Sequence, residues 1–213
     1  MPTTSRQTSA TRTDTTSRLP ISLGSTNKRY EPSTHLRPAG QTPLIPETAL
    51  AARYQALEHY PAGSLGRAYW EYCRANGFAL PGENDGAAEP ILFHDCSHVL
   101  SGYGTEPEGE VQVACFSASF QRRDPWLFVF FVLLQFHVGI RMTAITKART
   151  GFFDPAKALV AIRRGDAMNV DLNNGWDYWP VMGEQVEELR RRYNILPSET
   201  FEPAIRQAVG NVA

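Results

Sequence analysis

Two histidines one helical turn apart are the residues of this sequence best suited to chemistry. His94 and His98 are four positions apart, with Asp95 between them, in the segment LFHDCSHVLSG. On an α-helix this spacing directs both imidazoles to one side, where they can bind the same metal ion. Glu110 follows after eleven further residues. Two imidazoles and two carboxylates suit zinc, iron, manganese or cobalt, and this ligand set alone does not choose among them.

A helical wheel separates these side chains from the apolar ones. At about 100° per residue, His98 lies about 40° and Asp95 about 100° from His94. The apolar residues occupy the opposite sector: Leu92, Phe93, Cys96, Val99 and Leu100. Gly102 would leave room beside the histidines for a substrate or a closely packed helix. We therefore predict that His94, Asp95, His98 and Glu110 hold one divalent metal, with zinc as the first expectation.

A second helix, from about Pro107 to Arg123, must carry Glu110 to the histidines. Three small residues follow Glu110 along one stripe of this helix, which permits a close approach: Ala114, Ser117 and Ala118. The turn at 102–107 is short enough to join two consecutive antiparallel helices. Asp95 could be a metal ligand. It could instead be a base, which is the role of the acid between two such histidines in metalloproteases, and it is the candidate catalytic residue.

The motif resembles the signature HDxxH-x11-E of a coenzyme Q (ubiquinone) biosynthesis family, the fourth of the Coq series. All four motif positions match, and the likeness covers about residues 44–196. It includes PAGSLGRAY at 61–69, HVLSGY at 98–103 and the region 176–195. The resemblance implies a mostly helical protein peripheral to a membrane, with the four motif residues as metal ligands.

The resemblance also implies a place in ubiquinone synthesis. The family is linked to replacing the C1 carboxylate of prenylated aromatic intermediates by hydroxyl, a decarboxylase or lyase-type activity, and to organising other quinone-biosynthesis proteins. A metal would hold the ring oxygens and stabilise negative charge as CO2 leaves. Expected partners are a prenylated aromatic lipid, those proteins and a membrane surface, and a homodimer is among the expected assemblies. The protein would lie at the cytoplasmic face of a bacterial inner membrane or the matrix face of a mitochondrial one.

Two other functions remain open on the sequence. One is a non-catalytic scaffold that binds a prenyl lipid, because four protein ligands close a structural zinc site. The other is an HD-type metal-dependent hydrolase, which needs a further upstream histidine and a downstream aspartate. His59 and either Asp154 or Asp166 could supply them.

The elements that must position these residues are predicted to be helices. Ser64 is a candidate N-cap for a helix that ends at Asn76-Gly77, and Asp124-Pro125 and Asp154-Pro155 are two further start signals. Strand-like alternation is rare. We predict an all-α fold, a single domain of about seven helices over residues 41–213, including a last long helix at 183–193.

The longest apolar run extends from Trp126 to Ile140, and we expect its helix to continue to about Arg149. Such a run is shorter than the roughly 20 residues of a membrane span, and it predicts a central core helix. If the resemblance holds, it would also help to enclose a prenyl tail, with Phe131 and Leu134 as candidate substrate contacts.

Composition is that of an ordinary soluble chain. Of its 213 residues 42% are hydrophobic and 20% are charged, and the net charge of −1 provides no basic field for nucleic acid. Three cysteines without a CxxC indicate free thiols. Residues 1–40, rich in Ser, Thr and Arg, predict a disordered tail, and a mitochondrial transit peptide is the alternative.

Overall fold

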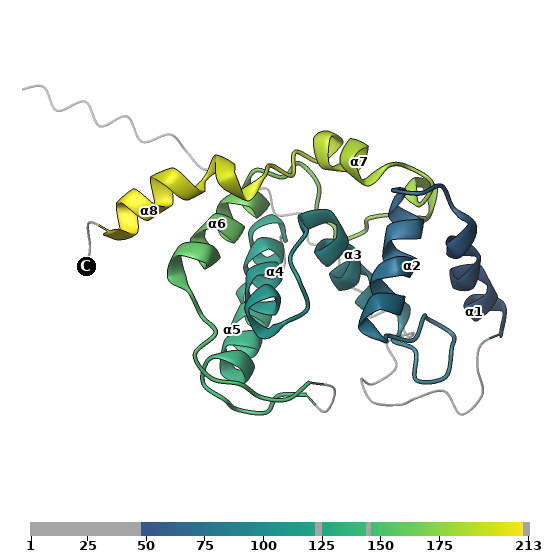
Figure 1. Cartoon of the computed structure of the whole chain (residues 1–213), viewed down its shortest axis with the longest axis horizontal. Helices are drawn as coiled ribbons and strands as arrows, with labels where there is room; N and C mark the ends of the chain where they lie inside the picture. The colour runs from purple at the N-terminus through teal and green to yellow at the C-terminus, as the bar shows by residue number, and fades with distance from the viewer. Residues whose placement is uncertain (1–47, 122–124, 144–145, 211–213) are drawn as a thin grey trace, which may run out of the picture. The chain divides into compact units, whose positions relative to one another are not determined.

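All regular secondary structure in the described residues is helical. The structure, a computed structural model, describes residues 48–121, 125–143 and 146–210 (Figure 1). It has eight α-helices in these ranges and no sheet, which confirms the all-α prediction with one helix more than expected. They are α1 (Thr48–Gln55), α2 (Leu65–Asn76), α3 (Leu92–Ser101), α4 (Pro107–Phe120), α5 (Pro125–Phe136), α6 (Pro155–Asp166), α7 (Val186–Arg192) and α8 (Glu202–Gly210).

Local capping explains where two of these helices begin. The Ser64 hydroxyl accepts a hydrogen bond from the backbone N–H of Arg67 in the first turn of α2. This helix ends at Gly77, which has the left-handed conformation. The Asp154 carboxylate accepts two backbone N–H groups of the first turn of α6, and Pro155 occupies its first position. Both start signals are confirmed. The expected cap at Asp124 lies outside the described residues.

The helix α5 ends at Phe136, whereas the sequence predicted an end near Arg149. Buried Gln135 accounts for the difference, because its side-chain oxygen accepts the backbone N–H groups of Met142 and Thr143, each at 3.0 Å. The chain turns back on itself, and the N–H of Arg149 donates to the carbonyl of Gln135 at 2.9 Å. A polar side chain inside the apolar run thus organises the turn that follows the helix.

The central helix of the fold is α4. It contacts α3 on one side and α5 and α6 on the other, while α2 and α7 pack against α3 (Figure 1). Most residues of α4 are buried, including Val113, Ala114 and Phe116. The apolar helix α5, predicted at the centre, instead lies at the surface, with Leu127 69% exposed. Its inner side alone meets α4, and this one-sided contact leaves the outer side uncovered.

These helices belong to one compact unit. The three cysteines are free, as predicted, and all three are buried. In the described ranges, no helix is both long enough and apolar enough to cross a membrane.

Candidate metal centre

Three predicted ligands come together between α3 and α4. The Nε2 atoms of His94 and His98 are 3.1 Å apart. The carboxylate of Glu110 lies 3.3 Å from the first and 3.6 Å from the second. Ligand atoms about 2.0–2.1 Å from a tetrahedral ion are about 3.3–3.4 Å from one another. The three side chains are therefore spaced as ligands of one metal ion.

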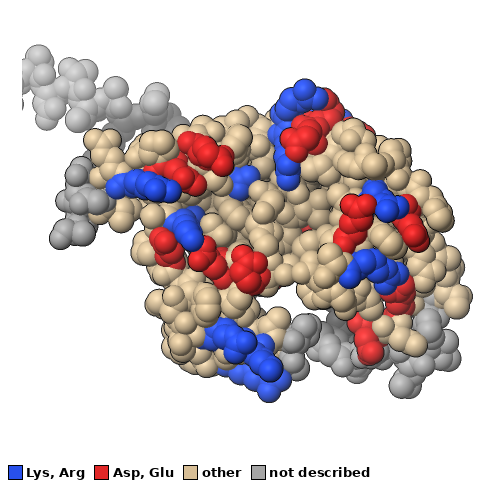
Figure 2. All heavy atoms as spheres, in the orientation of Figure 1, with Lys and Arg blue, Asp and Glu red and all other residues tan. Residues whose placement is uncertain are grey.

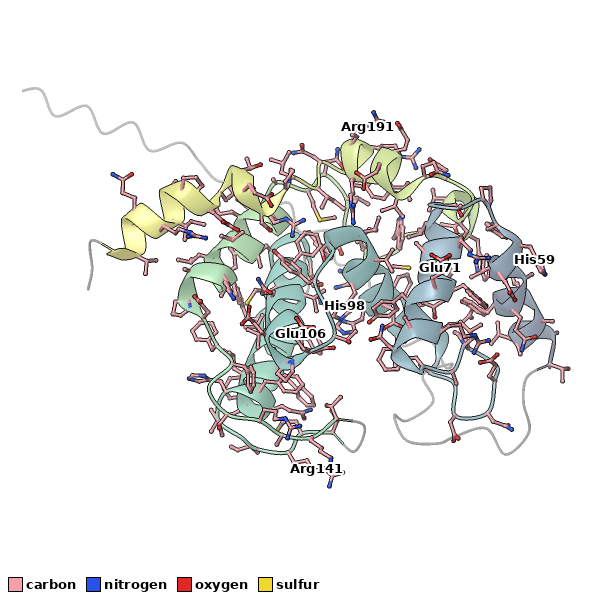
Figure 3. All side chains as sticks on the ribbon, viewed as in Figure 1. His59, Glu71, His98, Glu106, Arg141 and Arg191 are labelled. Carbon is pink, nitrogen blue, oxygen red and sulfur yellow. The ribbon has the colours of Figure 1, made fainter. Side chains whose placement is uncertain are left out.

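Close backbone packing brings Glu110 to the histidines. Glu110 is in the first turn of α4, and Gly109 precedes it. A Cβ at Gly109 would lie only 2.2 Å from the carbonyl oxygen of Gly104, so only glycine lets α4 start against the turn that follows α3. His98 extends from α3 toward this first turn (Figure 3).

The surroundings of His98 favour the neutral tautomer whose Nε2 atom is free to bind a metal. Its Nδ1 lies 3.0 Å from the backbone carbonyl oxygen of Tyr103. A carbonyl only accepts hydrogen bonds, so Nδ1 carries the proton and the lone pair of Nε2 faces the other ligands. Burial, with a smaller effect of His94, lowers the pKa of His98 and favours the neutral imidazole. The ring of Tyr72 stacks on it at a centroid distance of 5.6 Å.

Asp95 lies outside this cluster. In the described part of the chain, the three-residue set with mutually close ligand atoms does not include it. Asp95 is buried, and its charge raises the pKa values of Tyr69, Tyr72 and Cys73 of α2. Burial raises the pKa of Asp95 to about 6, an effect opposed by His94. Its assignments as fourth ligand and as catalytic residue stay predictions.

No protein family and no curated protein matches this chain. The likeness of its motif to the coenzyme Q family therefore stays a prediction, and the site is interpreted from its own geometry.

The backbone conformation at position 102 is sufficient to explain why this residue is glycine. Gly102 is exposed and forms the left-handed C-cap of α3, with a φ of 80° that side-chain-bearing residues rarely adopt. An added Cβ would contact only the Nη2 atom of Arg190, at 3.8 Å. A contact of Gly102 with substrate stays a prediction.

The apolar helix α5 meets the candidate metal centre through Phe128. The rings of Phe128 and His94 are in edge-to-face contact, with centroids 5.3 Å apart. Phe131 follows three positions later and so lies on the same side of α5 as Phe128. Both Phe131 and Leu134 are half-buried. They remain candidate substrate contacts, whereas Phe128 contacts His94 directly.

An apolar cavity of about 290 Å³ lies between α4, α5 and α6. Residues of α5 on its wall are Trp126, Val129 and Leu133. Apolar side chains such as Leu159 and Ile162 of α6 complete it. The cavity is thus formed by the same helix whose Phe128 contacts His94.

Two contributors to the site were missed on the sequence alone: the ring of Tyr72 and the carbonyl of Tyr103. Gly102, a recognisable helix stop, marks where α3 ends and so places a turn near His98. It does not indicate which carbonyl of that turn the imidazole meets, because this depends on how the turn packs.

Proposed function

We propose that His94, His98 and Glu110 bind one divalent cation, and that this centre acts on the C1 carboxylate of a prenylated aromatic compound in ubiquinone biosynthesis. The observation that carries the proposal is the three-ligand cluster with the ring of Phe128 against His94. Catalytic zinc sites have three protein ligands and keep one position for water or substrate. An apolar ring beside that position suits a substrate with a hydrocarbon tail.

The bound cation would supply Lewis acidity toward the oxygens of the substrate. Replacing the carboxylate by hydroxyl balances as ArCO2⁻ + H2O → ArOH + CO2 + H⁺ + 2e⁻, with molecular oxygen as the class of electron acceptor. Within the chain, Glu110 offsets the charge of the cation. Asp95, next to His94 on α3, is the candidate to accept the proton.

An exposed apolar surface on α5 supports the same proposal. Exposed Trp126, Leu127 and Phe130 lie on this helix, and the cavity beneath it approaches the lower size range of ligand sites, about 300 Å³. An isoprenoid chain entering from this side would reach the cavity and Phe128 over apolar surface.

Basic residues follow α5 in the sequence. Arg141, Lys147 and Arg149 are exposed, and residues 125–153 contain no Asp or Glu. Figure 2 shows basic side chains without acidic ones at the end of the molecule where Figure 3 labels Arg141. Apolar side chains flanked by cations suit the surface of an anionic membrane. We propose that α5 and the segment after it contact such a surface.

The two alternative functions fit less well. A structural zinc site needs four protein ligands, and the cluster has three. For a hydrolase of the HD type, His59 and Asp154 or Asp166 would have to join the centre. Within the described ranges, none of these belongs to the cluster, and Asp154 caps α6 instead.

Complementation tests the proposed reaction. In a host that lacks its own equivalent, the wild-type chain should restore quinone, whereas His94→Ala should not. A wild-type chain that folds and binds metal but fails to restore quinone would refute the proposed substrate. Full restoration by a His94→Ala variant shown to be metal-free would refute the catalytic role of the metal.

Sedimentation with lipid vesicles tests the proposed membrane contact. The wild-type protein should sediment with vesicles containing anionic lipid more than with purely zwitterionic ones. Leu127→Ser and Lys147→Gln should each reduce this binding. Phe78→Ser, a similar change at an exposed site on another segment, is the control and should bind as the wild type does. Equal binding by all variants would contradict the assignment of this surface.

A further inference from the structure

Arg164 is a buried cation that holds the last turn of α3 although it is not a ligand. This residue of α6 is 5% exposed. Its Nε donates to the carbonyl of Leu196 at 2.7 Å, and its Nη2 donates to the carbonyl of Ser101 at 2.8 Å. The guanidinium lies over the ring of Tyr103, 4.8 Å from the centroid.

The partners of Arg164 explain how its charge is tolerated. Among the described residues no carboxylate forms an ion pair with it, and a buried cation without compensation is unstable. The Ser101 carbonyl belongs to the C-terminal, negative end of α3, and the Tyr103 ring presents a negative face. The charge of Arg164 is therefore balanced by the very turn that it contacts.

That turn leads directly to the metal centre. The hydroxyl of Ser101 accepts the backbone N–H of Tyr103 at 3.3 Å. The carbonyl of Tyr103 in turn lies 3.0 Å from Nδ1 of His98. Arg164 thus holds the turn at two places, at the Ser101 carbonyl before Gly102 and at the Tyr103 ring after it. Gly102, between them, has a backbone that rotates readily when it is not held.

We propose that Arg164 is a positioning residue for the metal centre. It fixes the Tyr103 carbonyl so that His98 keeps its proton on Nδ1 and presents Nε2 to the metal. This inference rests on the proposed role of His98 as a ligand. Arg190 of α7 acts differently, since it donates to the carbonyls of Val99 and Leu100, which come before this turn.

The tautomer of His98 in the metal-free protein is the decisive measurement. Long-range 1H–15N spectra of the labelled full chain, at a pH of about 8, distinguish a proton on Nδ1 from one on Nε2. The wild type should show the proton on Nδ1, and Arg164→Met should show a mixture of both tautomers. Arg163→Met changes the exposed neighbouring arginine of α6 and should match the wild type. Arg190→Met loses helix caps but should keep the wild-type tautomer.

Cobalt titration provides the second readout. Loss of a group that orients a metal ligand lowers affinity about 10–100-fold, and Arg164→Met should fall in this range. Arg164→Lys keeps the charge but loses the forked geometry of the guanidinium, and its cobalt affinity should lie between those of Arg164→Met and the wild type. A folded Arg164→Met protein with the wild-type tautomer and affinity would overturn the proposal. So would failure of both Arg164 variants to fold, which would make the residue purely structural. If the wild type binds no cobalt, the proposed metal site fails, while the tautomer spectra still test the positioning.

Discussion

Replacing Glu110 by glutamine should remove most of the affinity for divalent metal. Glutamine keeps the size of the side chain but loses the charge of the group that lies 3.3 and 3.6 Å from the two Nε2 atoms. A four-ligand structural zinc site is worth about 10–16 kcal/mol, which is about 2.5–4 kcal/mol for each ligand. At 1.4 kcal/mol for each factor of ten, Glu110→Gln should bind zinc about 10²–10³-fold more weakly.

Thermal unfolding converts this loss into a measurable difference. At a free zinc concentration of about 100 times the wild-type Kd, the bound metal stabilises the wild type by about 2.7 kcal/mol. For a chain of this size the Tm should rise by about 5–11 °C. Glu110→Gln should gain about 0.4 kcal/mol or less under the same conditions, and so show almost no shift.

Glu106→Gln is the matched control. Glu106 lies four residues earlier at the start of the same helix, with the same change of charge, and the ligand cluster does not include it (Figure 3). It should keep the wild-type shift of Tm. An undiminished shift in Glu110→Gln, with about one metal per chain by elemental analysis, would refute the ligand assignment. Absence of any shift in the wild type with zinc, iron, manganese or cobalt would refute the centre itself.

Three further predictions concern the surroundings of the site and the stability of the fold. Gly109→Ala should lower metal affinity and destabilise the fold by about 1–3 kcal/mol, because the added Cβ would meet the Gly104 carbonyl. Metal titration and urea unfolding measure these two effects, and wild-type values in both would contradict the packing argument. Hydrogen bonds from Arg74, chiefly, lower the pKa of Glu83 to about 2, so the stability that it provides is complete above about pH 4.5 and is lost as the pH falls toward 2. Glu83→Gln should therefore destabilise the protein by about 1–3 kcal/mol at pH 7 and by less at pH 3 in urea unfolding, whereas equal losses would exclude this linkage. Asp95→Asn tests the prediction that Asp95 is a fourth ligand: the three-residue cluster alone predicts a change in zinc affinity of less than about tenfold, and a loss of more than about 100-fold in the same titration would place Asp95 among the ligands.

The sequence determined the features that depend on neighbours along the chain. The spacing of His94 and His98 fixes the angle between them on any helix, and their convergence needs nothing beyond α3. The starts of α2 and α6 were readable for the same reason, because Ser64 and Asp154 bond to N–H groups within the next turn. Glu110 was a weaker inference, since it required two helices to pack face to face.

Only the tertiary structure decided which sides of the helices are covered. The apolar composition of α5 predicted burial, yet α4 packs against only one side of it and leaves Leu127 at the surface. Asp95 shares a helix with the histidines and is buried where α2 packs against α3, yet the ligand cluster leaves it out. Arg164 meets Ser101 across 63 positions of sequence. The spacing of residues on one helix sets the directions of their side chains. The residues that those side chains contact come from segments far apart in the chain.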